Sequence, residues 1–488
     1  MTKALVATLL LIISLNASAA LTDRLLPSQP TRPGANTARL NAQIIDLTLS
    51  DAIYLGLRDN RAIRSAYLDR VAQKFDLLVA EDRFTPKLVL SGSYLAARNQ
   101  DDRYRQRDIA PSTTLLTPYG TQFSLAWTHR ARQADAAGND RNDGASITVI
   151  QPLLRGAGRE SATAPVRLAR LSEQINRLTL KTTVAQTITQ IIMAYRELLR
   201  AQEQLQIASD ALTRSRQLLD VNRLLIIAGR MAEFDVVQTE ADVATQELSY
   251  EEAINQLDNS RLELLQLLAL DLRTSVRAAE KLQASRVSVS PIEALKQAEA
   301  MQPTYLTQLI AGEQVHINLA VARNERLWDV SLVGGASQLR DRNITSGGSH
   351  SWENYLGVQV EIPIGDMSWR QAEVQARVNV QNQHIQLTEA RQQLERDVTN
   401  AVRDIGARWR QFEIAQRARE LSRRKLDIER EKLTVGRSSN FQVLSYEADL
   451  RNAENARLDA LIAYLNAQAQ LDQTLGTTLQ SWDISLND

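Results

Sequence analysis

The residue types that most often catalyse reactions or bind metals are scarce in this sequence. Cysteine is absent, which excludes disulfide bonds, thiolate metal sites and cysteine-linked lipids. The four histidines, at positions 129, 316, 350 and 384, show no spacing typical of a metal site or a catalytic triad. The pairs Gly334-Gly335 and Gly347-Gly348 are not followed by the Gly-Lys-Ser/Thr of a nucleotide-binding loop. The sequence therefore predicts no enzyme activity, no metal and no cofactor.

The remaining candidates for recognition lie in two similar segments. AGRMAEFDVVQTEADV begins at Ala228, and VGRSSNFQVLSYEADL begins at Val435, 207 positions later. Seven of the residues between Gly229 and Val243 recur in the second segment, where composition alone would give about one match. A period near 200 residues indicates a duplication and predicts two similar halves.

Glycine and arginine occur together in both segments. Gly229 and Gly436 suit the left-handed conformation that ends a helix, so each segment is expected to form an exposed turn between two helices. Capping explains the glycines alone, whereas the recurrence of Arg230 and Arg437 favours contact with carboxylates or carbonyls of a partner. The residues expected at these partner-facing turns are Ala228, Gly229, Arg230, Met231, Val435, Gly436, Arg437 and Ser438.

Long helices are expected to position these turns. Apolar residues recur every seven positions from Val184 to Ile226, which predicts a left-handed coiled coil. The same period runs from Val398 to Leu433, with an interruption at Arg419. At 1.5 Å per residue, the stretch from Val166 to Ala228 would span roughly 95 Å. Each long helix is expected to reverse into a shorter one, which gives antiparallel pairs.

Between the helices the hydrophobic period changes from seven to two, which is typical of β-strands. Two strands are predicted in each half, as pairs at 87–98 with 144–154 and at 329–339 with 352–364. Aromatic residues near the strand ends fit either the belt at a membrane interface or a local core. These residues are Tyr94, Trp328, Trp352, Tyr355 and Trp369.

The connector from Arg98 to Gly144 breaks the symmetry between the halves. It contains a further strand-like stretch from Tyr119 to His129. If the helices on both sides of the strands share one side of a membrane, the number of crossings must be even. This stretch is therefore interpreted as part of an external hairpin or as an irregular first half of the descending strand.

The N-terminus is expected to direct export. Lys3 precedes an apolar run from Ala4 to Leu15, and Ala17-Ser18-Ala19 provides small residues for cleavage. The run is too short to span a bilayer. The predicted divisions are a signal peptide 1–19, an extended leader 20–45, repeat 1 at 46–270, a linker 271–290, repeat 2 at 291–476 and a tail 477–488. In each repeat a short helix precedes the strand pair, and a long helix (158–228 or 368–435) and a second short helix (231–270 or 438–476) follow it.

An exported chain with alternating segments of about ten residues suits the outer membrane of a Gram-negative bacterium, because only closed barrels satisfy strand backbones in lipid. Four strands cannot close alone. Two copies would give an eight-stranded barrel that is too tight for large cargo, and three copies would give twelve strands. Oligomerisation is therefore expected.

The order of elements, with QPLLRGAG at 151–158 and GRSSNFQVL at 436–444, resembles the TolC family of outer-membrane channel proteins from Asp46 to Gly476. The resemblance implies a mainly helical mixed fold in a homotrimer. In it, a twelve-stranded transmembrane β-barrel, with four strands per protomer, continues into an α-barrel of antiparallel coiled-coil helices across the periplasm. Such proteins are passive exit ducts for efflux pumps or type I secretion systems. Their helix turns are expected to dock onto a periplasmic adaptor, or membrane fusion, protein that an inner-membrane transporter drives.

The resemblance also places an aperture near the turns, where family members carry acidic residues. The second segment has Gln442 and Ser445 there, whereas the first segment keeps Asp235. Glu240 and Glu447 are the other acidic candidates, and they could equally pair with arginine on neighbouring helices. The acidic candidates for the aperture are therefore Asp235, Glu240 and Glu447.

A second class of function is a periplasmic coiled-coil adaptor or scaffold without a pore. It explains the heptads but gives the strand segments no role. A formal net charge of zero, from 57 basic and 57 acidic residues, argues against nucleic acid as a partner. The cargo of a duct is left open, because drugs, metal ions, peptides and proteins all fit.

Overall fold

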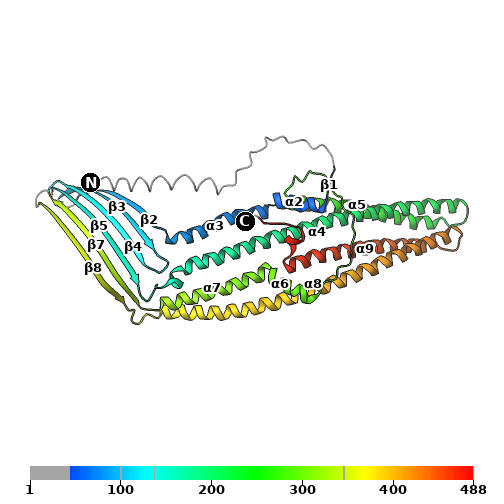
Figure 1. The fold of residues 1–488 in the computed structure, drawn as a ribbon. Helices are drawn as coiled ribbons and strands as arrows, with labels where there is room; N and C mark the ends of the chain where they lie inside the picture. The colour runs from blue at the N-terminus through cyan, green and yellow to red at the C-terminus, as the bar shows by residue number, and fades with distance from the viewer. Residues whose placement is uncertain (1–43, 99, 101, 137, 344–346, 487–488) are drawn as a thin grey trace. The chain divides into compact units, whose positions relative to one another are not determined.

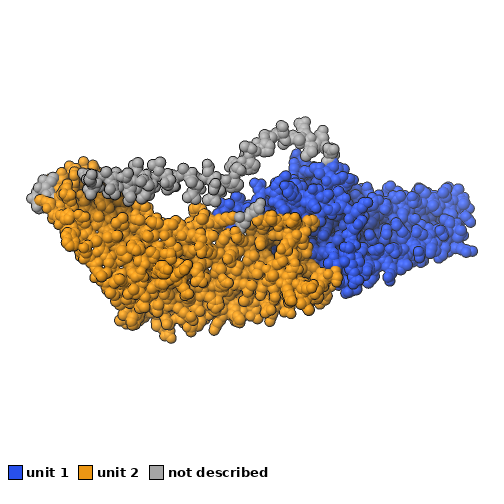
Figure 2. Space-filling view, viewed as in Figure 1, with its two compact units in different colours: residues 1–71, 186–287, 404–470 blue, residues 72–185, 288–403, 471–488 orange. Residues whose placement is uncertain are grey.

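The computed structural model describes residues 44–98, 100, 102–136, 138–343 and 347–486. The predicted signal peptide and almost all of the predicted leader lie outside the described residues. The chain forms two compact units (Figure 2). Unit 1 consists of the residues up to Val71 with Gln186–Val287 and Asp404–Gln470, and unit 2 consists of Ala72–Ala185, Ser288–Arg403 and the residues from Leu471.

A small parallel sheet and a capped helix begin unit 1. β1 (Ile45–Leu47) pairs with β6 (Val276–Ala278), which lies within the predicted linker. α2 (Leu49–Asp59) starts at a capping box, in which Thr48 and Asp51 each bond the backbone N–H of the other. The buried hydroxyl of Tyr195 donates to the carbonyl of Leu47 at 2.8 Å, and burial raises the pKa of Tyr195 to about 12.

Asn60 divides the first helical stretch in two. α2 ends before it, α3 (Arg61–Glu81) begins after it, and a short 3-10 turn, η1 (Asp82–Phe84), follows. The Asn60 amide donates to the carbonyl of Leu267 at 2.7 Å, and its oxygen accepts from the N–H groups of Ala62 and Ile63. Asn60 therefore caps α3 and fixes it to α5, which a hydrophobic period alone does not reveal.

The longest elements are α4 (Arg159–Ile227) and α8 (Ser368–Thr434), with 69 and 67 residues. At 1.5 Å per residue each is about 100 Å long. α5 (Phe234–Leu267) follows α4, and α9 (Asn440–Leu475) follows α8. The other helices are α6 (Pro291–Met301), α7 (Pro303–Glu325) and the short α10 (Thr478–Ser481). Among the described helices, none has a stretch long and apolar enough to cross a membrane.

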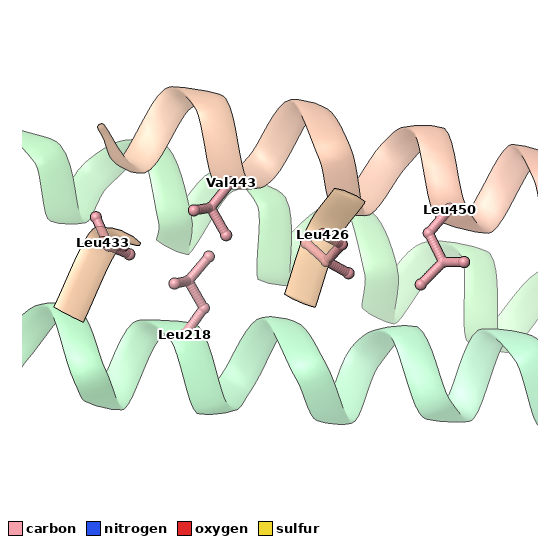
Figure 3. Close-up of a cluster of buried hydrophobic side chains, with 5 residues drawn as sticks. All are labelled: Leu218, Leu426, Leu433, Val443 and Leu450. Atoms are coloured by element: carbon pink, nitrogen blue, oxygen red, sulfur yellow. The ribbon is translucent and has the colours of Figure 1, made fainter. Parts of the chain in front are cut away.

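Most heptad positions of the two long helices are buried. In unit 1, five buried aliphatic side chains from three helices point toward one another (Figure 3). Burying one such side chain stabilises the fold by about 1.5–3 kcal/mol. The packing therefore joins α4, α8 and α9 close to the second turn. The five residues are Leu218 of α4, Leu426 and Leu433 of α8, and Val443 and Leu450 of α9.

Unit 2 contains a six-stranded antiparallel sheet in the order β2-β3-β4-β5-β7-β8 (Figure 1). The first half of the chain supplies four strands and the second half supplies two, so the prediction of four strands per protomer is wrong. The strands are β2 (Lys87–Arg98), β3 (Arg103–Leu116), β4 (Gln122–Ala134), β5 (Gly138–Pro152), β7 (Asp329–Asn343) and β8 (Gly347–Glu361).

The connector between residues 98 and 144 accounts for the difference. The stretch from Tyr119 to His129 belongs mostly to β4, which pairs with both β3 and β5, so it is neither an external hairpin nor an irregular strand. The strands at 87–98 and 144–154 do not pair with each other. β3 alternates charged with polar residues, and Pro111 lies where its ladder to β4 is interrupted, so the hydrophobic pattern does not mark β3. β3 and β4 form a hairpin within the sheet, and these two added strands keep the number of strands even.

The sheet has two faces of opposite character in the half next to the helices, because side chains alternate along each strand. The apolar face carries Leu88, Leu90, Ile109, Leu115, Phe123, Leu125, Trp127, Ile147, Val149, Leu332, Leu356, Val358 and Val360. The opposite face is mainly polar, with Val89, Ile150 and Val333 as apolar exceptions, and it carries Ser91, Ser93, Ser112, Thr114, Ser124, Thr128, Ser146, Thr148, Ser337 and Gln359.

Candidate functional site

Both predicted turns are closed by the same backbone geometry. Gly229 has φ +67° and Gly436 has φ +74°, the left-handed region that favours glycine. The N–H of Arg230 donates to the carbonyl of Leu225 at 2.8 Å, and the N–H of Arg437 makes the equivalent bond at 2.8 Å. Each turn is therefore a Schellman-type helix end.

The outer side chains of the turns are free to meet a partner. Ala228, Arg230, Val435 and Arg437 are all exposed. Neither arginine forms an ion pair or a side-chain hydrogen bond with a described residue. Each turn therefore presents an unpaired guanidinium beside an apolar residue, which suits a carboxylate or carbonyl on another protein.

The inner side chains of the turns are attached to the helices. Met231 packs against the apolar cluster of unit 1. Ser438 donates from Oγ to Oε1 of Glu429 at 2.6 Å, and the Lys432 ammonium lies 3.1 Å from the same carboxylate. The Ser438 hydrogen bond, followed by that from Lys432, holds the pKa of Glu429 below its ordinary value of 4.5. The first turn is thus attached by apolar contact and the second by a carboxylate.

A buried polar cluster joins three helices near the turns. Asn222 of α4 and Thr239 of α5 are fully buried, and Asn440 at the start of α9 is nearly so. Nδ2 of Asn222 donates to Thr239 Oγ1 at 2.8 Å and to Asn440 Oδ1 at 2.7 Å. Nδ2 of Asn440 donates to Thr239 Oγ1 at 2.9 Å and to the Asp235 carbonyl at 3.2 Å. These bonds fix the register of α4, α5 and α9.

Three of the aperture candidates are half-exposed. Asp235, Gln442 and Ser445 lie in the first two turns of α5 and α9. Their side chains form no ion pair or hydrogen bond with a described residue. The Asp235 carboxylate is thus an unpaired negative charge close to the first turn, whereas the equivalent Gln442 is neutral.

Glu240 and Glu447 occupy equivalent sequence positions in different environments. Glu240 accepts from Arg223 at 3.0 Å, and the two side chains are 49% and 54% exposed. Glu447 is only 10% exposed and accepts from Arg214 of α4 at 3.0 Å and from Arg430 of α8. Glu447 therefore connects α9 to two long helices, whereas Glu240 forms a surface pair.

The arginine partners also recur at the offset of 207 residues. The pairs that repeat are Arg223–Glu240 with Arg430–Glu447, and Arg216–Glu247 with Arg423–Glu454. The sequence interpretation did not identify these arginines. Comparison of the residues before each glycine at the same offset would have found them.

The aromatic residues predicted for an interface do not share one face. The register places Tyr94 and Trp352 on the apolar face, where both are well exposed. Tyr355 lies on the polar face with its hydroxyl 3.2 Å from Thr148 Oγ1. The spacing of three residues from Trp352 turns Tyr355 to the other side of the strand, so it does not belong to a belt with Trp352.

The remaining aromatic residues flank the strands. Trp328 precedes β7 and is exposed, while Trp369 lies in the first turn of α8 with the Arg155 guanidinium carbon 5.3 Å from its ring centre. Trp127, which the sequence interpretation omitted, lies on the apolar face and stacks on His129.

Residues 294–477 match the family model described as outer membrane efflux protein. The fold is similar to that of the CmeC outer membrane channel of Campylobacter jejuni, with a TM-score of 0.67 and 14% identity over 88% of this chain and 86% of that chain. The matched segment lies in the second half of the chain and is similar to this family, and the structural likeness shows a shared fold.

Two further solved structures have a similar fold. VceC from Vibrio cholerae is 13% identical over 88% of this chain and 96% of that chain, with a TM-score of 0.67. The open state of the MtrE channel of Neisseria gonorrhoeae is 16% identical over 88% of this chain and 89% of that chain, with a TM-score of 0.66. A sequence search of curated proteins finds no match.

The candidate site combines features that suit recognition of another molecule. Its turns present free guanidinium groups, its helices are fixed by buried polar contacts, and its sheet separates an apolar from a polar face. They can bind a protein partner, hold a passage open or closed, and place strands in lipid.

Proposed function

We propose that this protein is the outer-membrane exit duct of a tripartite efflux pump or a type I secretion system. Three copies close the sheets into one barrel, and the long helices extend the passage into the periplasm. The duct is passive, so an inner-membrane transporter supplies the energy. The observation that carries the proposal is the sheet with one apolar face, one polar face and two open edges.

The edge strands require neighbours. β2 and β8 end the strand order, and both are more than ten residues long. In lipid, an unpaired row of N–H and C=O groups is very costly, so the strands must pair with those of other copies. Three copies of six strands give eighteen, which replaces the twelve expected from the sequence. The apolar face then contacts lipid and the polar face lines water.

A stripe on α8 also calls for a second copy. Ile414, Leu421 and Ile428 are spaced seven residues apart, and all are exposed. Apolar residues with this spacing form the seam of a coiled coil, and α8 has no described helix over them. Their burial against the neighbouring copy supports a ring of helices that forms the periplasmic part of the duct.

The two turns are the proposed docking points for a periplasmic adaptor. Gly229, Gly436 and the free Arg230 and Arg437 give each copy two similar exposed ends, so a trimer would present six. Asp235 would add one carboxylate per copy near the passage, and the neutral Gln442 would alternate with Asp235 around the ring. The two internal repeats are thus proposed to give nearly sixfold symmetry to the docking end. An adaptor without a pore would leave the two-faced sheet unexplained.

The absence of native cysteine permits a direct test of ring closure. Ser91→Cys on β2 and Gln359→Cys on β8 both lie on the polar face, and neighbouring positions on β8 are scanned in parallel. Oxidation of outer membranes should give covalent trimers that disappear with reductant. Single-channel conductance of the purified protein in planar bilayers completes the test. Recovery of the chain as a periplasmic protein without conductance would refute the duct.

A further inference from the structure

The apolar face becomes strongly basic at the end of the sheet away from the helices. Seven arginines lie on this face beyond the apolar residues, and all seven are exposed. Within the described strands, the acidic residue on this part of the face is Asp143, which is bonded to His129. We call these seven residues the arginine band: Arg98, Arg103, Arg105, Arg107, Arg141, Arg340 and Arg342.

The polar face at the same end has the opposite balance of charge. Four carboxylates there, those of Asp108, Asp140, Asp341 and Glu353, face two arginines, Arg130 and Arg132. Arg130 is bonded to Asp108 at 2.8 Å, and Arg132 stacks on the Tyr104 ring at 4.0 Å. The polar face thus pairs Arg130 with a carboxylate and places Arg132 on an aromatic ring, with Arg132 Nε left without a hydrogen bond. In the arginine band, Arg107 lies 6.0 Å from the ring centre of Tyr94.

Two pairs within the band place like charges directly opposite each other. Arg98 is the cross-strand partner of Arg103, and Arg141 is the partner of Arg342. Like charges at directly opposed positions destabilise a sheet. None of these four side chains forms an ion pair with a described residue. An anion held between each pair would turn repulsion into two charge-assisted hydrogen-bonding forks.

The position of the band indicates the source of the anion. It continues the same face that carries the apolar residues, and in the proposed duct that face contacts lipid. The helices attach to the other end of the strands, so the band lies at the outer leaflet. We propose that the arginine band binds the phosphate groups of anionic lipids in the outer leaflet. This inference rests on the proposed outer-membrane duct.

Guanidinium chemistry suits this occupant. Arginine presents a planar fork that matches phosphate oxygens, and it is less strongly hydrated than lysine. Each basic residue near an anionic membrane surface strengthens binding by about fivefold. A phosphate between Arg141 and Arg342 would also fix β5 against β7, the place where the two halves of the chain meet in the sheet.

The test compares two double variants of the full-length trimer in detergent. Arg141→Gln with Arg342→Gln removes a pair from the band, and Arg130→Gln with Arg132→Gln removes two charges from the polar face. Native mass spectrometry measures binding of a bis-phosphorylated lipid A and of the same lipid without phosphates. The wild type should prefer the phosphorylated lipid. The band variant should bind it roughly 30-fold more weakly, and the polar-face variant within twofold of the wild type.

Arg141→Lys with Arg342→Lys keeps the charge and serves if the glutamine variant does not assemble. It should retain part of the preference and lose the part that depends on the fork. Equal binding of both lipids by the wild type would overturn the proposal, and so would an unchanged preference in the band variant. Full competition by equimolar inorganic phosphate would also overturn it, because a soluble anion would then suffice. If the wild-type protein conducts ions but does not prefer the phosphorylated lipid, lipid binding by the arginine band is refuted and the duct is not. If the wild-type protein neither conducts ions nor is found in the outer membrane, the duct itself is refuted.

Discussion

Replacement of Glu447 by glutamine should lower the local stability of α9 much more than Glu240→Gln lowers the local stability of α5. The Glu447 carboxylate is 10% exposed and lies 3.0 Å from the Nε of Arg214, which is itself 15% exposed. Removal of one partner from a buried ion pair costs about 3–5 kcal/mol, because the other charge stays buried without compensation. Glutamine keeps the shape and removes only the charge.

Two details lower the expected cost. Arg430 is 33% exposed and recovers water when the pair is broken, and Arg214 retains a second carboxylate, that of Glu454, at 3.6 Å. We therefore expect a loss of about 2–3 kcal/mol in local stability. Glu240→Gln is the matched control. Its ion pair with Arg223 is half exposed, and such surface pairs contribute about 0–1 kcal/mol.

Hydrogen exchange of backbone amides measures both changes in the assembled protein, because exchange reports local opening. Peptides from the first turns of α9 should exchange roughly 30- to 150-fold faster in Glu447→Gln, at a tenfold change per 1.4 kcal/mol. The equivalent peptides of α5 in Glu240→Gln should change less than about fivefold. Equal acceleration in the two variants would refute the reasoning, since it would mean that burial of Glu447 makes no difference.

Three further changes have predictable results. Gly436→Ala places a Cβ on a residue with φ +74°, so it should lower the stability of the second turn by about 1–2 kcal/mol and accelerate hydrogen exchange there. Unchanged exchange would exclude backbone strain at this position. Leu125→Arg on the apolar face should lower the free energy of unfolding in lipid by about 2–4 kcal/mol, as measured by urea titration, whereas Ser124→Arg on the polar face should be tolerated. Equal effects of the two changes would contradict the assignment of faces. Because the pKa of Glu429 is lowered in the folded protein, its carboxylate adds stability that is present above pH 4.5 and is lost as the pH falls through the folded pKa. Hydrogen exchange at the second turn should therefore become faster in acid, and Ser438→Ala should weaken this pH dependence.

The helices and turns could be predicted from the sequence because their signals are local and long. A seven-residue period extends over many turns of each long helix, with one interruption at Arg419 in the second, and Gly229 and Gly436 can adopt the left-handed backbone that ends a helix. The attachment of Asn60 to α5 could not be predicted, because it is a hydrogen bond to Leu267, more than 200 residues away. Local pattern does not report such contacts.

The strand count and the aperture residues show more clearly what the local sequence cannot predict. β3 has arginines on the apolar face where apolar residues would be expected, so alternation of hydrophobicity fails although the strand is regular. Glu240 and Glu447 lie in nearly the same local sequence, yet one is exposed and the other buried. The difference comes from Arg214 of α4, which packs against α9, and nothing within either segment encodes that neighbour.

The hairpin of β3 and β4 has a consequence for the cargo. It adds two strands to each copy without adding a helix, and barrel width grows in proportion to strand number. An eighteen-stranded ring would be about 1.5 times as wide as a twelve-stranded ring and would have roughly 2.25 times its cross-sectional area. The exit at the cell surface would then be too wide to sort molecules by size. Discrimination between small solutes and folded polypeptides would fall to the helical end, where three carboxylates of Asp235 and three amides of Gln442 would surround the path.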